Sequence, residues 1–516
     1  MSRSSWRFRA AATGAAALTA AALLPGPARA SRTVSESFTV PAGGTVVVTG
    51  HGYGHGHGMS QYGAQGAARQ GLTARQILAF YYPGTTLATT AGTIGVLITA
   101  DTDNAVQVVP ATGLRVREVG SGATYALPAT AGIKTWRLRT VSGRTVLDYD
   151  DGAWHAYLPG GAALSGDAEL YGPASVGLRV GSATRAYRGA LRLSSSDTVN
   201  VLALDDYVKG VVPREMPASW AGAALQAQAV AARTYAARDR ADHATRYYQT
   251  CDTTSCQVYG GLGSEDSRSN AAVAATANQV LNYRGTPAFT QFGSSSGGWL
   301  ADGGQPYLVA KPDPYDGASG NPVHTWSRTL TRASIQKAYP SLGTLQRIAV
   351  TRRDGHGEWY GRVEQMVLDG SRANVTLAGT TFRSKFGLRS QWFHFSGSTA
   401  TTAPAAAPTT AITQRWKAIG GNRSKLGKAT SAEYAVAGGR ERRFKHGRIF
   451  SKAGAGTHEI YGRVLKPYVR RGEATSRLGF PTSAPHRFKR GVYARFEHGV
   501  LKVFRKGRVQ VVYSRR

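Results

Sequence analysis

The stretch that decides the fold class is VVPREMPASWAGAALQAQAVAARTYAA, residues 211–237. From residue 218 to residue 240 it has no proline and no glycine after 222, which removes the usual helix breakers. Apolar residues recur along one stripe at Leu225, Ala229, Ala232 and Ala236. The pattern therefore predicts a helix over 218–240 whose small residues permit close packing, and a second helix over 268–281.

The segments before this helix have a residue pattern typical of β-strands. Residues 33–50 and 92–212 alternate β-branched and polar residues between glycine-rich turns, which predicts many short strands. On this interpretation Glu215 lies where the last strand gives way to the helix. The predicted fold class is α+β: a β-rich body with a central helix, followed by a small β-rich repeat module.

Composition changes along the 516 residues predict four parts. Residues 1–30 carry arginines, a short apolar run and ARA at 28–30, the pattern of a secretory signal peptide, so the mature chain is expected to begin at Ser31. An uncleaved N-terminal anchor is the alternative; no later segment is apolar enough for a stable membrane span. A body over 31–395, a Ser/Thr/Ala/Pro linker over 396–412 and a repeat module over 413–516 follow.

The repeat module is recognised by three landmarks at one offset. LGKATS at 426 and LGFPTS at 478 lie 478 − 426 = 52 residues apart, and so do FKHGRI at 444 and FEHGVL at 496. Trp416 and Tyr468 share that spacing. A single offset for separate motifs indicates a duplication of small β-rich units.

Positive charge is concentrated in the repeat module. The whole chain has a net charge of +33, and residues 413–516 contain 26 Lys and Arg against 5 Glu, giving 26 − 5 = +21. Such a module binds polyanions, and outside the cell we expect anionic cell-wall polymers as partners and no nucleic acid. The alternative is a cationic, solvated surface without a specific partner.

Two cysteines, Cys251 and Cys256, are too few for a disulfide framework. In an exported protein they are expected to form one local disulfide. The alternative is a zinc site completed by His243, because one imidazole and two thiolates suit that metal.

Glu215 is the candidate catalytic residue. On position alone it is a helix-capping glutamate, because a helix N-terminus favours the ionised carboxylate. An acid catalyst needs the opposite, a pKa raised by apolar burial, and Met216, Trp220 and Tyr207 are candidates to supply it.

Several motifs together resemble the SpoIID/LytB family, known from sporulation. They are VNVLALDDYVKGVVPREMPASWAGAALQAQAVAARTYAA at 199–237, QVYGG at 257–261 and FTQFGSSSGGWLAD at 289–302. The resemblance implies a secreted, cell-wall-associated lytic transglycosylase that cleaves peptidoglycan glycan strands, with Glu215 as the catalytic acid and Arg233 as a supporting residue. It also leaves open a non-catalytic, glycan-binding activator of a cell-wall amidase. The LG motifs resemble the LGFP repeat, which implies attachment to the wall, although Lys428 and Ala429 depart from it.

GHGYGHGHGMSQYGAQGAARQGLTARQILAFYYPGT, residues 50–85, is similar to a segment expected near the C-terminal end of that family, so the order looks permuted. Its glycines predict a flexible loop that binds sugar, rather than a metal site built on His51, His55 and His57. No cofactor and no metal are expected. The substrate-binding residues expected besides Arg233 are Tyr207, Gln257, Tyr259, Ser294, Ser295, Ser296, His55, His57 and Gln61.

One catalytic acid is enough for the implied reaction. In a lytic transglycosylase the muramic acid 6-hydroxyl attacks intramolecularly, so Glu215 would protonate the leaving oxygen and then accept the hydroxyl proton. Asp205 and Asp206 are expected on the preceding strand, where neighbouring residues point to opposite faces and at most one reaches the groove.

Overall fold

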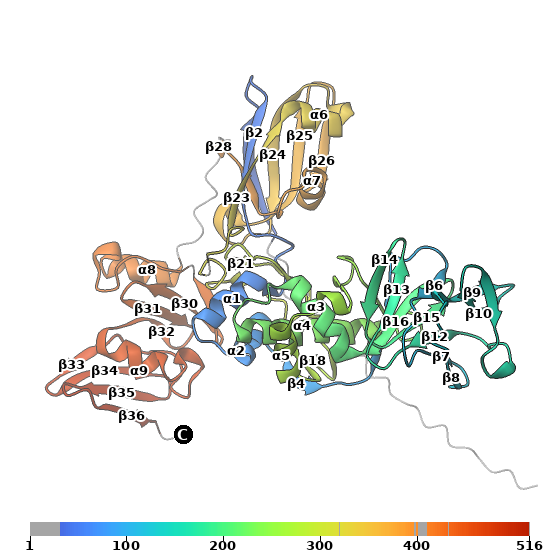
Figure 1. Ribbon diagram of the computed structural model, residues 1–516. Helices are drawn as coiled ribbons and strands as arrows, with labels where there is room; N and C mark the ends of the chain where they lie inside the picture. The colour runs from blue at the N-terminus through green and yellow to red at the C-terminus, as the bar shows by residue number, and fades with distance from the viewer. Residues whose placement is uncertain (1–30, 319, 397–398, 401–409, 432, 515–516) are drawn as a thin grey trace, which may run out of the picture.

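The computed structural model describes residues 31–318, 320–396, 399–400, 410–431 and 433–514. The predicted signal peptide and most of the predicted linker lie outside the described residues. Figure 1 shows helices at the centre of the chain, with one β-rich lobe above them, a second to the right and the C-terminal units to the left. A β-rich α+β fold, as predicted, is therefore confirmed. None of the described helices is both long and apolar enough to cross a membrane.

The upper lobe joins the N-terminal strands to strands more than 270 residues further along the chain. A five-stranded sheet of order β26-β25-β24-β1-β28 and a three-stranded sheet of order β23-β2-β27 share one hydrophobic core. This lobe therefore closes only when both distant segments are present. Its elements are β1 (Arg32–Thr39), β2 (Thr45–His51), β23 (Thr325–Thr331), α6 (Arg332–Ala338), β24 (Leu345–Arg353), β25 (Val363–Gly370), β26 (Asn374–Ala378), α7 (Gly379–Phe386), β27 (Phe393–Phe395) and β28 (Thr399–Ala400).

The right-hand lobe holds the strands predicted between residues 92 and 203. Its six-stranded sheet has the order β11-β10-β9-β6-β13-β14 and its seven-stranded sheet the order β17-β5-β16-β15-β12-β7-β8. Its elements are β5 (Thr93–Leu97), β6 (Ala105–Val108), β7 (Arg115–Glu118), β8 (Thr124–Ala126), β9 (Thr135–Val141), β10 (Arg144–Asp150), β11 (Trp154–Tyr157), β12 (Ala168–Tyr171), β13 (Val176–Val180), β14 (Ala183–Tyr187), β15 (Ala190–Ser194), β16 (Asp197–Ala203) and β17 (Thr250–Cys251).

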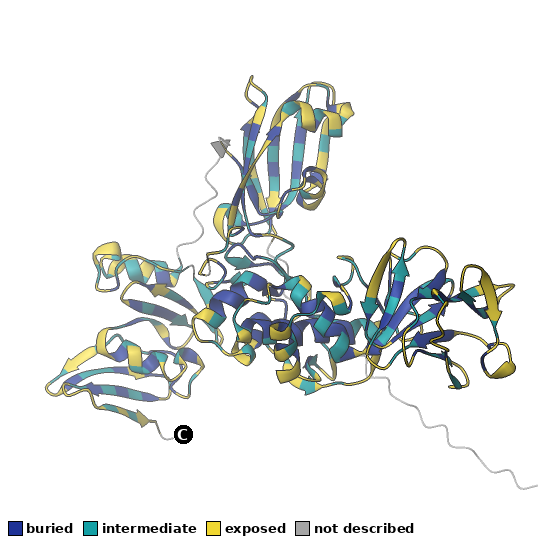
Figure 2. Cartoon of the chain, in the orientation of Figure 1, coloured by how far each residue is buried: buried dark blue, intermediate teal, exposed yellow. Residues whose placement is uncertain are grey.

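The central layer is built on the predicted long helix, α4 (Gly222–Asp242). The predicted stripe is buried, and Figure 2 shows dark blue, buried residues along the helices at the centre of the chain. The other elements of this layer are β3 (Met59–Ser60), α1 (Gln61–Arg69), α2 (Ala74–Tyr81), β4 (Thr86–Thr89), α3 (Leu204–Glu215), α5 (Ser267–Ala275), β18 (Gln279–Tyr283), β19 (Thr286–Pro287), β20 (Phe292–Gly293), β21 (Trp299–Leu300) and β22 (Lys311–Pro312).

The interpretation of residues 204–212 as strand was wrong, because these residues open helix α3. Their buried residues follow the spacing i, i+3, i+4, i+7, i+8 of a helix face rather than a strand's alternation. The members of that face are Leu204, Tyr207, Val208, Val211 and Val212. Asp205 and Asp206 therefore stand in the first turn of a helix and not on a strand.

The second predicted helix is shorter than 268–281. Helix α5 ends at Ala275, and the chain turns through Asn278, whose φ of 60° lies in the left-handed region. The residues from Gln279 onward then form strand β18, paired with β4.

The C-terminal units repeat their structure at the predicted offset. Each is a four-stranded antiparallel meander, and the isolated bridges Ala429↔Phe444 and Pro481↔Phe496 are displaced by 496 − 444 = 52 residues. Phe450 of the first unit joins the core of the second, against Tyr468 and Phe480. The elements are α8 (Ala411–Ala418), β29 (Tyr434–Val436), β30 (Gly439–Phe444), β31 (Gly447–Lys452), β32 (Gly456–Tyr461), α9 (Leu465–Val469), β33 (His486–Phe488), β34 (Gly491–Phe496), β35 (Gly499–Phe504) and β36 (Val509–Tyr513).

Arg233 ties α4 to the helices around it. Its side chain is fully buried, pairs with Asp205 of α3, and donates to the carbonyls of Gln279 (3.1 Å) and Val273 (3.3 Å). One guanidinium thus satisfies acceptors on three elements in the centre of the fold.

We predict that Arg233→Met lowers the free energy of unfolding by about 3 kcal/mol, because it removes the charge partner of Asp205 and a donor to the carbonyls of Gln279 and Val273. Arg238→Met is the matched control on the same helix. It breaks only a partly exposed pair with Asp242 and should cost less than about 1 kcal/mol. Denaturant unfolding followed by fluorescence checks both values, and equal losses would contradict the structural role of Arg233.

Candidate functional site

Glu215 is the last residue of α3, and its side chain is half-buried. The sequence placed it before a helix, whereas the structure places it at a helix C-terminus. The difference matters because the C-terminal end of a helix dipole is negative and disfavours a carboxylate charge. A helix-capping role for Glu215 at an N-terminus, the alternative drawn from position, is therefore not what the structure shows.

The side-chain contact of Glu215 comes from the glycine–histidine segment, residues 50–85. Gln61, the first residue of α1, donates a hydrogen bond from Nε2 to Glu215 Oε2 at 3.1 Å, across 154 residues of chain. Four residues later, Gln65 Oε1 accepts from the backbone N–H of Ala221 (2.9 Å), just before α4. Helix α1 thus contacts the end of α3 and the start of α4, which is where Glu215 lies.

The surroundings of Glu215 raise its pKa above the ordinary value of a glutamate. Burial is the largest cause. Hydrogen bonds from Gln61 and from the backbone of Val258, and the charge of Arg214, act in the opposite direction without reversing it. A carboxyl group that keeps its proton to higher pH is suited to act as a general acid.

QVYGG contributes to the site through its backbone. Val258 supplies the backbone hydrogen bond to Glu215, whereas the side chains on either side of it, Gln257 and Tyr259, point into the core and are 2% and 6% exposed. Tyr259 bonds to Asn200 (2.8 Å) and lies so close to α3 that a Cβ at Gly210 would approach its ring to 2.4 Å.

Three expected substrate-binding side chains are therefore packing residues. Tyr207 is fully buried and donates to Gln257 Oε1 at 3.2 Å. Tyr207, Gln257 and Tyr259 all lack the exposure that a bound sugar would require, and the prediction of a direct contact was wrong for them. The expectation that Arg233 contacts substrate is revised for the same reason. Its side chain is fully buried and pairs with Asp205.

The glycine–histidine segment, predicted to be a loop, packs closely against a neighbouring stretch of chain. Tyr53 pairs with Ser295 and His57 with Ala301, so the segment runs alongside residues 291–301. The glycines at 52, 54, 56 and 58 all have φ between 65° and 115°, a region that favours glycine. At Gly58 a Cβ would lie 2.0 Å from the carbonyl oxygen of Gln291.

The histidines of this segment lie in two places. His55 and His57 are neighbours, with ring centroids 4.6 Å apart, and His57 Nδ1 donates to Gln291 Oε1 at 3.1 Å. Burial, followed by the charges of His57, Arg383 and Arg362, lowers the pKa of His55 to about 3. His51 instead bonds to Glu358 at 3.0 Å in the upper lobe. Among the described residues no group of three or more His, Cys, Asp or Glu side chains is arranged to hold a metal ion.

The serines at 294–296, which we call the serine loop, are held by two buried carboxylates, Asp313 and Asp316. The sequence interpretation missed this pair. Ser295 Oγ donates to Asp316 Oδ2 and Ser296 Oγ to Asp313 Oδ2, each at 2.9 Å, and both serines are at most 3% exposed. Ser295 and Ser296 are thus internal, and their expected sugar contact was wrong. Ser294 is half-buried, and its carbonyl accepts from the N–H of Tyr62 at 3.0 Å. The only sequence signal for this pair is KPDPYDG, residues 311–317, a turn-like stretch.

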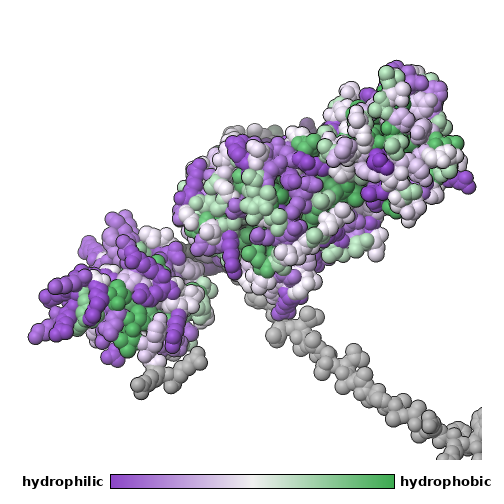
Figure 3. All heavy atoms as spheres, turned by 60° about the horizontal axis from the view of Figure 1, so that its bottom comes forward, coloured by the Kyte–Doolittle hydropathy of each residue, from purple (hydrophilic) through white to green (hydrophobic). Residues whose placement is uncertain are grey.

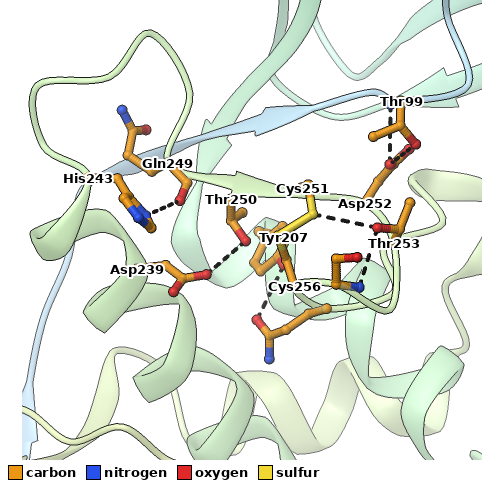
Figure 4. The surroundings of a disulfide bond; sticks show 12 residues. Thr99, Tyr207, Asp239, His243, Gln249, Thr250, Cys251, Asp252, Thr253 and Cys256 are labelled. Carbon is orange, nitrogen blue, oxygen red and sulfur yellow. Dashed lines mark hydrogen bonds between the residues drawn. A yellow bond between two sulfur atoms is a disulfide. The ribbon is translucent and has the colours of Figure 1, made fainter. Parts of the chain in front are cut away.

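The two cysteines form a disulfide, Cys251–Cys256. Figure 4 shows His243 apart from the sulfur atoms and directed at Gln249, to whose carbonyl its Nδ1 donates at 3.1 Å. Of the expected site residues, the structure thus brings together Glu215 and Gln61, and groups His55 and His57 along the neighbouring segment.

Comparison with known proteins identifies the class of domain that carries this site. The family model described as Stage II sporulation protein matches residues 193–283, and the LGFP repeat model matches residues 426–476. The chain thus contains a SpoIID-type domain and an LGFP repeat, which confirms the resemblance drawn from the motifs.

Individual relatives share parts of the chain. It is 41% identical over 135 residues to the "Amidase enhancer" of Bacillus subtilis (strain 168), covering 25% of this chain and 17% of that protein. It is 31% identical over 224 residues to "Stage II sporulation protein D" of the same organism, covering 39% of this chain and 63% of that protein. The chain therefore spans less than two thirds of the length of each of these relatives.

We predict that Gln61→Leu raises the pKa of Glu215 further, because it removes a hydrogen bond that favours the ionised carboxylate. Gln65→Leu, in the same helix, leaves that bond intact and should not move the titration. Infrared difference titration, with the carboxyl band assigned by its loss in Glu215→Gln, checks both. An unchanged midpoint in Gln61→Leu would show that the bond does not act on the carboxyl group.

Proposed function

We propose that this chain is an exported cell-wall protein and a lytic transglycosylase that cleaves the glycan strands of peptidoglycan, with Glu215 as its single general acid and base. The observation that carries the proposal is the Glu215–Gln61 pair: a half-buried carboxyl with a raised pKa, held by the side-chain amide of Gln61 and one backbone donor. The matches to the SpoIID and LGFP families support the cell wall as its place of action.

The proposed reaction uses the two protonation states of Glu215 in turn. The protonated carboxyl donates its proton to the oxygen of the scissile glycosidic bond as that bond breaks. The carboxylate then accepts the proton of the muramic acid 6-hydroxyl as this oxygen attacks the anomeric carbon. The product is an anhydromuramic end, so no water molecule is activated and no second carboxylate is required.

The arrangement of nearby acids supports a single-carboxylate mechanism. Asp205 is paired with the buried Arg233, and Asp206 is bonded to Lys209 at 2.7 Å. Both lie in the first turn of α3, at the opposite end of that helix from Glu215. Asp205 and Asp206 precede Glu215 by 215 − 205 = 10 and 215 − 206 = 9 residues, which is roughly 14 to 15 Å along the helix, too far for the spacing of about 5 to 9.5 Å that paired glycosidase carboxylates use.

A second candidate function is a non-catalytic protein that binds glycan and activates an amidase. Its specific support is the 41% identity to a protein named "Amidase enhancer". The two functions differ in what Glu215 does: a binding protein tolerates its neutral amide, whereas a transglycosylase does not.

The repeat module is proposed to hold the protein on anionic cell-wall polymers. It carries a net charge of +21 over residues 413–516, and Figure 3 shows hydrophilic residues over most of the left-hand lobe that these units form. Attraction between such a surface and a polyanion is long-ranged at low salt and screened at high salt.

We predict that Glu215→Gln lowers turnover on purified glycan strands by roughly a hundredfold to ten-thousandfold, the usual contribution of general acid–base catalysis. Strand binding should persist, because the amide keeps the shape of the carboxyl. Asp206→Asn is the matched control and should retain turnover. Mass spectrometry of the products, which should end in anhydromuramic acid, checks the reaction; wild-type-like cleavage by Glu215→Gln, or no cleavage by the wild type, would contradict it.

We also predict that a chain lacking residues 411–516 is released from isolated walls but keeps its turnover on soluble glycan. Retention of the full chain should fall as salt rises, because exposed charges are screened over about 8 Å at physiological ionic strength. A sedimentation assay across a salt series checks both effects. Retention of the shortened chain, or retention that is insensitive to salt, would contradict the role of the module.

A further inference from the structure

The upper lobe carries an open hollow beside the glycine–histidine segment. It has a volume of about 740 Å³ and is lined by Tyr53, Trp326, Ser327, Arg328, Arg383, Ser384, Gly387, Leu388 and Arg389. A second hollow of about 470 Å³ shares Arg328 and Gly387 with it and adds Lys385. The two hollows are both lined by residues of β23 and of the end of α7, and we call them together the arginine groove.

All the charged residues that line the arginine groove are cationic. They are Arg328, Arg383, Lys385 and Arg389. Within the described chain none of these four forms an ion pair with a carboxylate; Arg328 donates to the carbonyl of Gly387 at 3.0 Å and Arg383 to that of Leu388 at 3.4 Å. A guanidinium has five N–H donors, so most of their donors are available to a ligand.

Other arginines of the same lobe do have acidic partners. Arg347 pairs with Asp369 at 2.6 Å, Arg352 with Glu364 at 3.0 Å, and the buried Arg353 with Glu36 at 2.6 Å. Arg332 and Arg372 of the same lobe instead donate only to backbone carbonyls, so the groove is distinguished by having four unneutralised cations close together. Like charges that lie close together repel one another, weakly where water screens them, and an anion that joins them removes this repulsion.

The groove is connected to the segment that reaches Glu215. The ring of Tyr53 lies under Arg389, with 5.5 Å from the guanidinium carbon to the ring centroid, and Gly54 N–H donates to the carbonyl of Arg389 at 3.0 Å. From Tyr53 the chain runs through the histidines to Gln61, the residue bonded to Glu215. A ligand bound in the groove would therefore lie next to this segment.

We propose that the arginine groove binds an anionic group, a carboxylate or a phosphate, carried on an extended chain. Arginine favours these groups because its planar N–H fork matches two of their oxygens. The tyrosine and tryptophan rings provide an apolar surface for the carbon skeleton between the charges. This site is separate from the repeat module, and it does not depend on whether Glu215 cleaves glycan.

The test uses the full-length protein and two probes, a short oligoglutamate and a short-chain polyphosphate. Hydrogen exchange reports residues 326–331 and 383–389 separately from the repeat module, which also attracts polyanions. The variant is Arg328→Gln with Arg389→Gln, both exposed. The control is Arg75→Gln with Arg144→Gln, two exposed arginines outside the groove, which removes the same charge.

We expect at least one probe to slow exchange at 326–331 and 383–389 in the wild type and in the control. In the groove variant the concentration needed should rise by roughly tenfold or more, because hydrogen bonds to charged groups are lost. Protection by oligoglutamate alone identifies a carboxylate ligand and protection by polyphosphate alone a phosphate ligand. Protection confined to the repeat module, or an equal loss in the control, would overturn the proposal.

Discussion

The site depends on the carboxylate of Asp316, which is fully buried and holds two distant parts of the chain together. Its hydrogen-bond donors are the side chains of Ser60, Ser295, Asn321 and His324 and the backbone N–H groups of Ser296 and Gly297. Burial raises the pKa of this carboxyl, but bonds from His324, Ser60 and Ser295 outweigh it and lower the pKa overall. The pKa of the neighbouring Asp313 shifts in the opposite direction. Burial and the charge of Asp316 raise it to about 7.

The position of Gln61 follows from this carboxylate. Ser60 donates to Asp316 at 2.6 Å and at the same time accepts from Gly63 N–H at 2.9 Å as the N-cap of α1. Gln61 is the next residue, so the start of α1 is fixed before its side chain extends to Glu215. The connection explains how a segment that the sequence places 154 residues away can contribute to the site.

The fold class, the central helix and the repeat were predictable because each depends on a local pattern of spacing. Helix α3 was also encoded, since Leu204, Tyr207, Val208, Val211 and Val212 have helical spacing, but the β-branched residues nearby favoured a strand. Glu215 and Gln61 were predicted as site residues, whereas Tyr207, Tyr259, Ser295 and Ser296 have polar groups that serve the interior. Sequence does not distinguish a hydroxyl that meets a ligand from one that meets a buried carboxylate, because both require the same residue types. Because Ser295 and Ser296 were assigned to a ligand, the carboxylates that they contact, Asp313 and Asp316, were not sought.

The two central carboxyl groups, those of Glu215 and Asp316, show how hydrogen-bond donors assign a role to a buried acid. Burial acts on both in the same direction and favours the protonated form. Asp316 has six donors, including a histidine, and its charge is stabilised enough to serve as a structural anchor. Glu215 has the amide of Gln61 and one backbone donor, and the raised pKa persists. A further cationic or hydroxyl donor at Glu215 would lower its pKa and convert it into a second anchor. The neutral amide of Gln61 orients the carboxyl group of Glu215 without reversing the effect of burial on its pKa.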